Sequence, residues 1–147
     1  MFVKASLVIS LLSVALGLFA CSGSSEPKPR ADAIVWKHGG PAVVAHRGPL
    51  PSKLVVKDLK VGGGATLVKG STATLRYRNF DYRTGQRYED WWERPFITGF
   101  GKGESLGAWE TGLKGMRVGG RRELIVPAKE AYGHIPEIYV LELVSVH

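Results

Sequence analysis

The residues that most resemble a catalytic motif lie in GESLGAWETG, residues 103–112, which contain the pattern G-x-S-x-G. Serine hydrolases place a nucleophilic serine in this pattern, between a buried strand and a helix, with an acid and a histidine later in the chain. Glu130 and His134 follow Ser105 in that order. However, the preceding FITGFGKGE is not a fully buried strand pattern, and the compact part of the chain is too short for the parallel sheet such motifs need. We therefore predict that Ser105 caps a helix.

Other patterns that could bind a ligand or a metal are equally weak. The segment around Lys102, GKG, lacks the Ser or Thr that follows the lysine of a phosphate-binding loop. The four histidines are too dispersed for a recognisable metal site. Glu89, Asp90 and Glu93 could imitate the paired carboxylates of a glycosidase, but a solvated turn explains them better. The sequence therefore predicts no metal and no cofactor.

Charge and cysteine content limit the possible partners. The chain has 147 residues, a formal net charge of +7 and a single cysteine, Cys21, so it has no intramolecular disulfide. Lys and Arg are scattered among acidic residues rather than clustered, and no nucleic-acid partner is predicted. Attraction to anionic lipid explains the basic charge more simply.

The N-terminal segment is typical of export. Residues 1–20 carry Lys4, then an apolar run and small residues, which is the pattern of a signal peptide. The run is also near the length of a membrane span, so a retained anchor is the alternative. Leu18-Phe19-Ala20-Cys21 resembles the bacterial lipobox, whose cysteine is lipidated on its sulfur and becomes the new N-terminus. This resemblance implies that Cys21 carries a lipid that holds the protein on the extracytoplasmic face of the cell membrane.

The rest of the chain divides into two parts. Residues 21–52 are rich in small and polar residues, proline and glycine, and we predict a lipidated tether in which PAVVA could add an edge strand. Residues 53–147 are numerous enough for one modest hydrophobic core. Six segments within them have strand patterns: KLVVKDLKVG, TATLRYRNFDY, QRYEDWW, RPFITGF, RRELIV and EIYVLELVSV.

Only one segment has helical periodicity. Leu106, Trp109, Leu113 and Met116 are spaced to lie on one face of a helix, with Ser105 at the N-cap position. A pair of glycines, residues 119–120, lies beyond its far end. We predict an α+β domain in which an antiparallel sheet wraps over one short α-helix.

Aromatic residues at defined places are the remaining candidates for a site. From about Val56 to the end, the chain resembles FKBP-type peptidyl-prolyl cis-trans isomerases. The matching segments are KDLKVGGGA, RYRNF, GQRYED, RPF, GAWETGLKGMRVGGRRELIVP, EAYG and YVLELVSV. The most specific of them is GLKGMRVGGRRELIVP. In that family an antiparallel sheet half-wraps one short helix, and the substrate pocket lies between them.

The resemblance implies a role for each matching residue. It implies catalytic roles for Tyr77, Glu89, Trp109 and Tyr132, and substrate-binding roles for Tyr88, Phe96, Ser105, Leu106 and Tyr139. Trp109 would form the pocket floor, the Tyr132 hydroxyl would bind a ligand carbonyl, and the Leu106 N–H would hold the substrate. Tyr88 stands where the family has phenylalanine, and Arg94 where it has an arginine that pairs with the acid at Glu89.

The function that follows is cis-trans isomerisation of prolyl bonds, without cofactor or metal. The implied partners are proline-containing unfolded or exported polypeptides and FK506-like macrolides. After AYG the sequence continues only with HIPEIYV, a much shorter loop than family members have over the pocket. A non-catalytic binding module or holdase chaperone with a truncated pocket rim is therefore the alternative.

Overall fold

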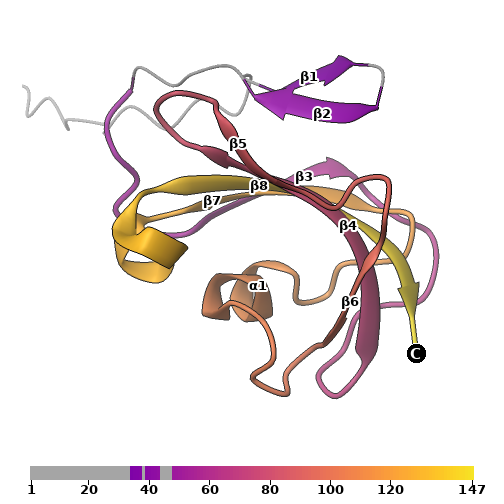
Figure 1. The fold of residues 1–147 in the computed structure, drawn as a ribbon. Helices are drawn as coiled ribbons and strands as arrows, with labels where there is room; N and C mark the ends of the chain where they lie inside the picture. Colours follow the sequence, from indigo (N-terminus) through magenta and orange to yellow (C-terminus); the bar gives the residue numbers. More distant parts are fainter. Residues whose placement is uncertain (1–33, 38, 44–47) are drawn as a thin grey trace, which may run out of the picture.

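A curved antiparallel sheet forms the centre of the protein in this computed structural model, which describes residues 34–37, 39–43 and 48–147 (Figure 1). Its strands follow the order β3-β7-β8-β4-β5, with β6 pairing with β4 beside β5. Their bounds are β3 Val55–Lys60, β4 Thr72–Asp81, β5 Arg87–Asp90, β6 Phe96–Gly99, β7 Arg121–Val126 and β8 Glu137–Val146. Each of the six predicted strand segments thus contains one strand, and the antiparallel α+β prediction is confirmed.

The two long central strands send alternate side chains to opposite faces of the sheet. Tyr139, Leu141 and Leu143 of β8 belong to the core cluster beneath the helix, whereas Ile138 and Val140 belong to a second cluster on the other face. This is the period of two expected of a strand. Since both faces are buried, the sheet is the middle layer of the domain.

The only α-helix among the described residues, α1, spans Gly107–Gly112 and lies inside the curve of the sheet (Figure 1). Its Trp109 is buried, as are Leu113 and Met116 just beyond its end. Gly112 allows a close approach to β7, because a Cβ at this position would lie 2.6 Å from a methyl carbon of Leu124.

The prediction that Ser105 caps this helix is wrong. Leu106 occupies the N-cap position, and no side chain caps the helix there. The Ser105 hydroxyl instead donates to Glu110 Oε1 at 2.5 Å. The chain turns into the helix one residue later than the periodicity suggested, so the serine side chain does not reach the free N–H groups of the first turn.

A β-hairpin formed by β1 (Ile34–Lys37) and β2 (Gly40–Val43) makes a separate two-stranded sheet. Ile34 and Val43 pack against the second cluster, formed by residues such as Phe80 and Tyr82 on the outer face of the main sheet. The segment predicted to be a tether therefore contains ordered structure in its described part. PAVVA contributes to β2, which pairs with β1 rather than with an edge of the main sheet.

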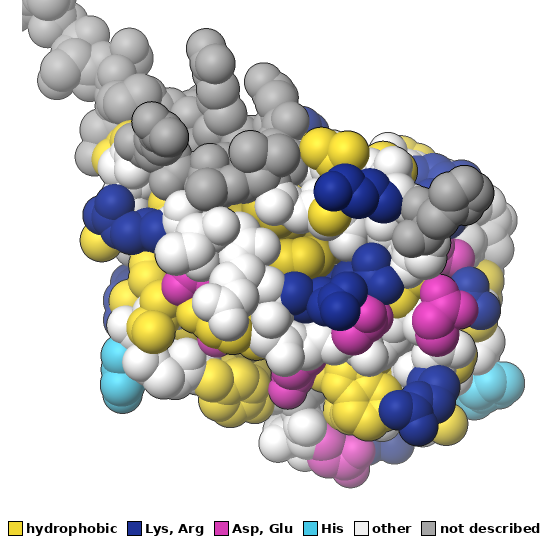
Figure 2. Space-filling view, turned by 45° about the horizontal axis from the view of Figure 1, so that its top comes forward, with side chains coloured by type: hydrophobic (Ala, Val, Ile, Leu, Met, Phe, Trp, Pro, Cys, Tyr) yellow, Lys and Arg dark blue, Asp and Glu magenta, His cyan; other side chains and the backbone are white. Residues whose placement is uncertain are grey.

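The predicted signal peptide and Cys21 lie outside the described residues. Within the described ranges, no helix is long and apolar enough to cross a membrane. The face of the molecule in Figure 2 carries Lys and Arg side chains interleaved with Asp and Glu, rather than a continuous basic patch.

Candidate functional site

A cavity of about 410 Å³ opens between the concave face of the sheet and the start of α1. Its lining comes from strands β4, β5, β6 and β8, from the loop before α1, and from the 3₁₀ turn η3 (Tyr132–His134). The lining residues are Tyr77, Glu89, Trp91, Phe96, Glu104, Ser105, Leu106, Trp109, Tyr132 and Tyr139. The structure therefore brings together every predicted site residue of the domain except Tyr88.

Trp109 is the floor of this cavity. Its ring is met edge-on by Tyr77, with centroids 4.8 Å apart, and by Tyr139, with centroids 5.5 Å apart. Phe96 approaches it at 6.2 Å, again nearly perpendicular. Such edge-to-face contacts are favourable between aromatic rings and fix their orientation. The result is an apolar cup with rigid walls, the width of which is set by side chains from four different elements.

Tyr77 is both a wall and a buried hydrogen-bond donor. Its hydroxyl donates to Glu89 Oε2 at 2.8 Å, joining β4 to β5 on the concave face. Burial, and then the hydrogen bond and charge of Glu89, raise the pKa of Tyr77 well above its ordinary value of 10.0. The phenol therefore stays protonated and continues to donate at neutral pH.

Tyr139 presents its ring to the cavity and directs its hydroxyl away from solvent. The hydroxyl donates to the buried Glu137 Oε2 at 2.5 Å. Burial, followed by this hydrogen bond and the charge of Glu137, raises the pKa of Tyr139. Since its polar end is already bonded, Tyr139 contributes apolar surface to the cup.

Two donors in the cavity wall are free to bind a ligand. The Tyr132 side chain is 67% exposed, and its hydroxyl has no hydrogen-bond partner among the described residues. The Leu106 N–H likewise has no acceptor in the part of the chain that the structure describes, whereas its carbonyl accepts from Trp109 and Glu110. Both residues line the cavity, so a carbonyl group bound there could accept from them.

Tyr88, a predicted substrate-binding residue, is not among the described residues that line the cavity. Glu89 and Trp91 point into the cavity, so Tyr88, which alternates with them along the strand, points out of it. The Tyr88 hydroxyl donates to Asp81 Oδ2 at 2.7 Å, which raises the pKa of Tyr88 to about 12.

Trp91 was not predicted, and it completes the wall that Tyr88 was expected to form. Its ring stacks on Tyr77 at 6.5 Å and meets Phe96 at 5.6 Å. The period of two from Glu89 was the signal that could have identified it. The expected ion pair between Arg94 and Glu89 is not formed in the described structure, where Glu89 is held by Tyr77.

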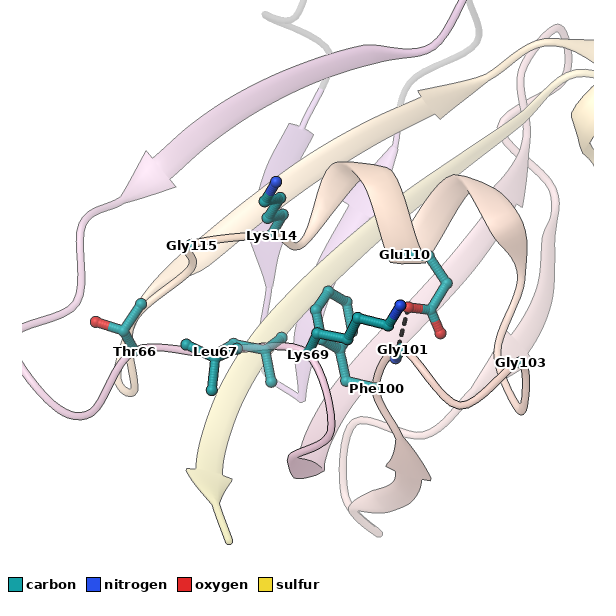
Figure 3. A pocket seen from close by; sticks show the side chains of 10 residues that line it. Thr66, Leu67, Lys69, Phe100, Gly101, Gly103, Glu110, Lys114 and Gly115 are labelled. Atoms are coloured by element: carbon teal, nitrogen blue, oxygen red, sulfur yellow. Dashed lines mark hydrogen bonds between the residues drawn. The ribbon is translucent and has the colours of Figure 1, made fainter.

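A second cavity, of about 580 Å³, lies between α1 and the segment around Leu67 (Figure 3). Among the described residues that line it, Phe100 is the only aromatic one and Glu110 the only acid, and both carboxylate oxygens of Glu110 are already hydrogen-bonded. Glu110 Oε2 accepts from the Gly101 N–H at 2.6 Å, and Oε1 accepts from Ser105. This cavity is larger but lacks an aromatic cup, and its acid serves to hold the loop before α1 in place. The smaller cavity is therefore the candidate site.

Within the described residues, no group of three or more His, Cys, Asp or Glu side chains is arranged to hold a metal ion. What the site does contain is a set of aromatic walls, two exposed carboxylates and two free donors. Such a site can enclose a flat apolar ring and orient the amides on either side of it, with the protein's own groups.

Comparison with known proteins agrees with this geometry. Residues 63–138 match the family model for the FKBP-type peptidyl-prolyl cis-trans isomerase. A probable FK506-binding protein of Corynebacterium glutamicum is 33% identical over 109 residues, which are 67% of this chain and 91% of the relative. An FK506-binding protein of Streptomyces anulatus is 39% identical over 88 residues, covering 58% of this chain and 71% of the relative.

Solved structures give the same result. The putative peptidyl-prolyl cis-trans isomerase FKBP12 from Mycobacterium tuberculosis superposes with a TM-score of 0.53 and 32% identity, covering 66% of this chain and 86% of that one. AtFKBP13, at 24% identity, shares the fold with a TM-score of 0.59, over 71% of this chain and 97% of its own. With the aromatic cup, the family match and these relatives in agreement, the chain belongs to the FKBP-type peptidyl-prolyl cis-trans isomerase family.

Proposed function

We propose that this peptidyl-prolyl isomerase assists the folding of exported polypeptides at the outer face of a bacterial membrane, to which a lipid on Cys21 anchors it. The aromatic cup around Trp109 supports the isomerase part of this proposal. The signal-like residues 1–20 and the position of Cys21 directly after them support the location. Its substrates would be unfolded or newly exported chains that contain proline.

The reaction needs no bond to be made or broken. Rotation about a peptide bond is opposed by about 18–20 kcal/mol of resonance energy, and prolyl bonds isomerise unaided in tens to hundreds of seconds. At the twisted geometry the amide has lost resonance, so its carbonyl oxygen carries less charge. An apolar, water-poor pocket therefore disfavours the planar amide more than the twisted one, which lowers the barrier.

The residues of the cup divide this work. Trp109 and the rings around it hold the prolyl ring. The Leu106 N–H and the Tyr132 hydroxyl orient the carbonyls on either side, which restricts the rotation to the prolyl bond. Glu89 fixes the Tyr77 hydroxyl at 2.8 Å, so that this side chain keeps one position in the wall.

The observation that carries the proposal is the perpendicular packing of three rings on Trp109. A protease-coupled assay of the full chain, with peptides that vary before proline, tests it directly. Trp109→Leu should remove most of the acceleration and weaken peptide binding. Since Leu113 and Met116 remain buried beside it, the variant should still fold. Circular dichroism and cooperative urea unfolding provide the check on folding.

A binding module or holdase without turnover is the second candidate. The short connection between β7 and β8, residues 127–136, leaves Tyr132 67% exposed at the rim, so water reaches the mouth of the cup. The same cup would then bind prolyl segments of unfolded chains without accelerating their isomerisation. Measurable peptide affinity with no acceleration in the folded wild-type protein would favour this second function.

The family also includes relatives named FK506-binding proteins, and an FK506-like macrolide is a ligand we propose for the same cup. Competition between the macrolide and a prolyl peptide for the wild-type protein would test whether they share the cup.

A further inference from the structure

Arg78 of β4 is a buried cation that joins three separate parts of the chain. It is 8% exposed. Its Nε donates to Asp90 Oδ1 of β5 at 2.8 Å, its Nη1 to the Pro41 carbonyl at 3.0 Å, and its Nη2 to the Gly39 carbonyl at 2.5 Å. Arg78 thus links the edge of the main sheet to the β1–β2 hairpin.

Both hairpin contacts satisfy groups that are costly to leave unpaired. A buried guanidinium needs its N–H groups hydrogen-bonded, because burial has removed the water that would otherwise accept from them. The carbonyls of Gly39 and Pro41 supply two of these acceptors. Without the docked hairpin, water would replace these two carbonyls, and the bond from Arg78 to Asp90 would become a solvent-exposed ion pair, which fixes side chains less firmly.

Strand β5, to which Arg78 is bonded, makes few other stabilising contacts. β5 has four residues, all exposed, and lies at an edge of the sheet where β4 is its only partner among the described strands. Its pairing with β4 shifts register between Asn79 and Phe80. Two side-chain bonds reinforce it from opposite faces, Tyr77 to Glu89 on the concave side and Arg78 to Asp90 on the outer side.

The hairpin also lies directly on Trp92. Trp92 is buried, and its ring lies 5.7 Å from that of Trp36 in β1. The Arg121 guanidinium sits over the Trp36 ring at 4.7 Å and near the Trp92 ring at 5.9 Å, close enough for cation–π attraction. The hairpin therefore holds both neighbours of Trp91 in the sequence, Asp90 through Arg78 and Trp92 through ring contact.

We propose that Arg78 and the β1–β2 hairpin are positioning elements for the isomerase pocket. With Asp90 and Trp92 fixed on the outer face, Glu89 and Trp91 are forced to point inward, where they form one wall of the cup. The N-terminal hairpin thus sets the shape of a pocket that it does not touch. This inference rests on the proposed function, since its main readout is turnover of prolyl substrate.

Gly40 gives a way to displace the hairpin in the full chain. Its φ is +121°, and a Cβ there would lie 2.6 Å from the Trp92 ring, so Gly40→Val should be incompatible with the docked hairpin. Gly48→Val is the matched control, because a Cβ at Gly48 meets no described residue within 4 Å and its φ is not positive. Hydrogen exchange at residues 34–43 reports whether the hairpin has undocked.

We expect Gly40→Val to lower kcat/KM for a prolyl peptide by about tenfold, as misplaced pocket groups commonly do, with Gly48→Val unchanged. Arg78→Lys should give an intermediate loss, because one ammonium cannot reach all three acceptors. Retained kcat/KM in a Gly40→Val protein whose hairpin has undocked would overturn the proposal.

A double-mutant comparison separates positioning from general destabilisation. If the hairpin acts through the pocket wall, Gly40→Val should have little further effect on a Glu89→Ala, Trp91→Ala protein. The same fold-loss in both backgrounds would overturn the proposal. If wild-type protein binds prolyl peptides but shows no turnover, the proposed function fails. In that case, peptide affinity replaces kcat/KM as the readout. It is measured in the wild type, in Gly40→Val, in the Glu89→Ala, Trp91→Ala protein and in the protein with all three substitutions, and the same outcomes support or overturn the positioning role.

Discussion

Tyr77 and Glu89 bond across the concave face of the sheet at 2.8 Å, while the next residue of each strand, Arg78 and Asp90, bonds across the outer face at the same distance. Because side chains alternate along a strand, two consecutive pairs fasten β4 to β5 from both sides. One pair lies in the pocket, and the other faces the hairpin. The chemistry of the pocket is therefore coupled to contacts made on the opposite surface.

Substrate charge should matter at this pocket. Glu89 and Glu104 line it, and the lining contains no Lys or Arg among the residues that the structure describes. We expect a peptide with Lys next to proline to give a higher kcat/KM than one with Glu, by about two- to fivefold, since both carboxylates are exposed. The preference should shrink in Glu89→Gln and in high salt. Equal rates for the two peptides at low ionic strength would contradict this prediction.

Removing the Tyr132 hydroxyl should slow turnover more than it weakens binding. The hydroxyl has no partner among the described residues and faces the cavity, so Tyr132→Phe loses a donor to the substrate but keeps the ring. We expect kcat to fall several-fold, in line with a lost hydrogen bond of about 1 kcal/mol, with a smaller change in KM. Steady-state kinetics with one good prolyl peptide measures both. A change in KM alone would assign Tyr132 to binding only.

Ser105→Ala should cost stability rather than abolish activity. The serine hydroxyl donates to Glu110 at 2.5 Å, and the same carboxylate holds the Gly101 N–H. Loss of this bond should lower the free energy of unfolding by about 1 kcal/mol, measured by urea denaturation. Most of the isomerase activity should remain. Complete loss of turnover in a folded Ser105→Ala protein would instead indicate a nucleophilic serine.

Asp90→Asn should make stability less sensitive to acid. Burial alone would raise the pKa of Asp90, but hydrogen bonds from Arg78 and the Trp92 N–H, with the charges of Arg78 and Arg87, lower it below its ordinary value of 3.8. An acid with a lowered pKa stabilises the folded state above its ordinary pKa, and this stabilisation is lost as pH falls through the folded value.

The asparagine variant should therefore be less stable than wild type at pH 7, and the difference should narrow below about pH 4. Urea unfolding at several pH values measures it. Glu137, whose pKa is raised by burial, contributes in the opposite sense but is present in both proteins, so the difference isolates Asp90. A gap that stays constant from pH 7 to pH 3 would show that the charge of Asp90 does not contribute.

Cys21→Ala should release the protein from membranes or leave its N-terminal segment unprocessed. The motivation is the position of Cys21 directly after the apolar run of residues 1–20. Membrane fractionation and the mass of the N-terminal peptide provide the measurement. A Cys21→Ala protein that is processed normally and still sediments with membranes would refute lipid anchoring.

Much of the pocket could be predicted from the sequence because periodicity and the family motif agreed there. The family resemblance assigned Tyr77 and Tyr139 to the pocket walls and Trp109 to its floor, and the helical spacing of Trp109 agreed with that assignment. Tyr88 was assigned to the pocket from the motif alone. Alternation along the strand instead directs its neighbours Glu89 and Trp91, on one face, into the cavity. The alternation of side chains along the strand was the more reliable guide to which residues line the pocket.

Other features depended on contacts that a linear pattern does not contain. Ser105 stands at a plausible cap position, but the backbone enters the helix at Leu106. The hairpin consists of two short apolar pieces in a segment rich in glycine and proline, which by itself resembles a linker. The hairpin is held in place by contacts with Arg78 and Trp92, which lie far along the chain. Nothing in the sequence around these two residues indicates that contact.

The docked hairpin gives the domain a defined response to mechanical load. In a chain held at its N-terminus, tension enters the described structure at Ile34 and meets the bonds of Arg78 to Gly39 and Pro41 before it reaches the main sheet. These few contacts are weaker than the long ladder between β4 and β8, so the hairpin should peel away first. Its release would lengthen the chain between Ile34 and the main sheet while the core stays folded, so moderate tension would leave the pocket intact.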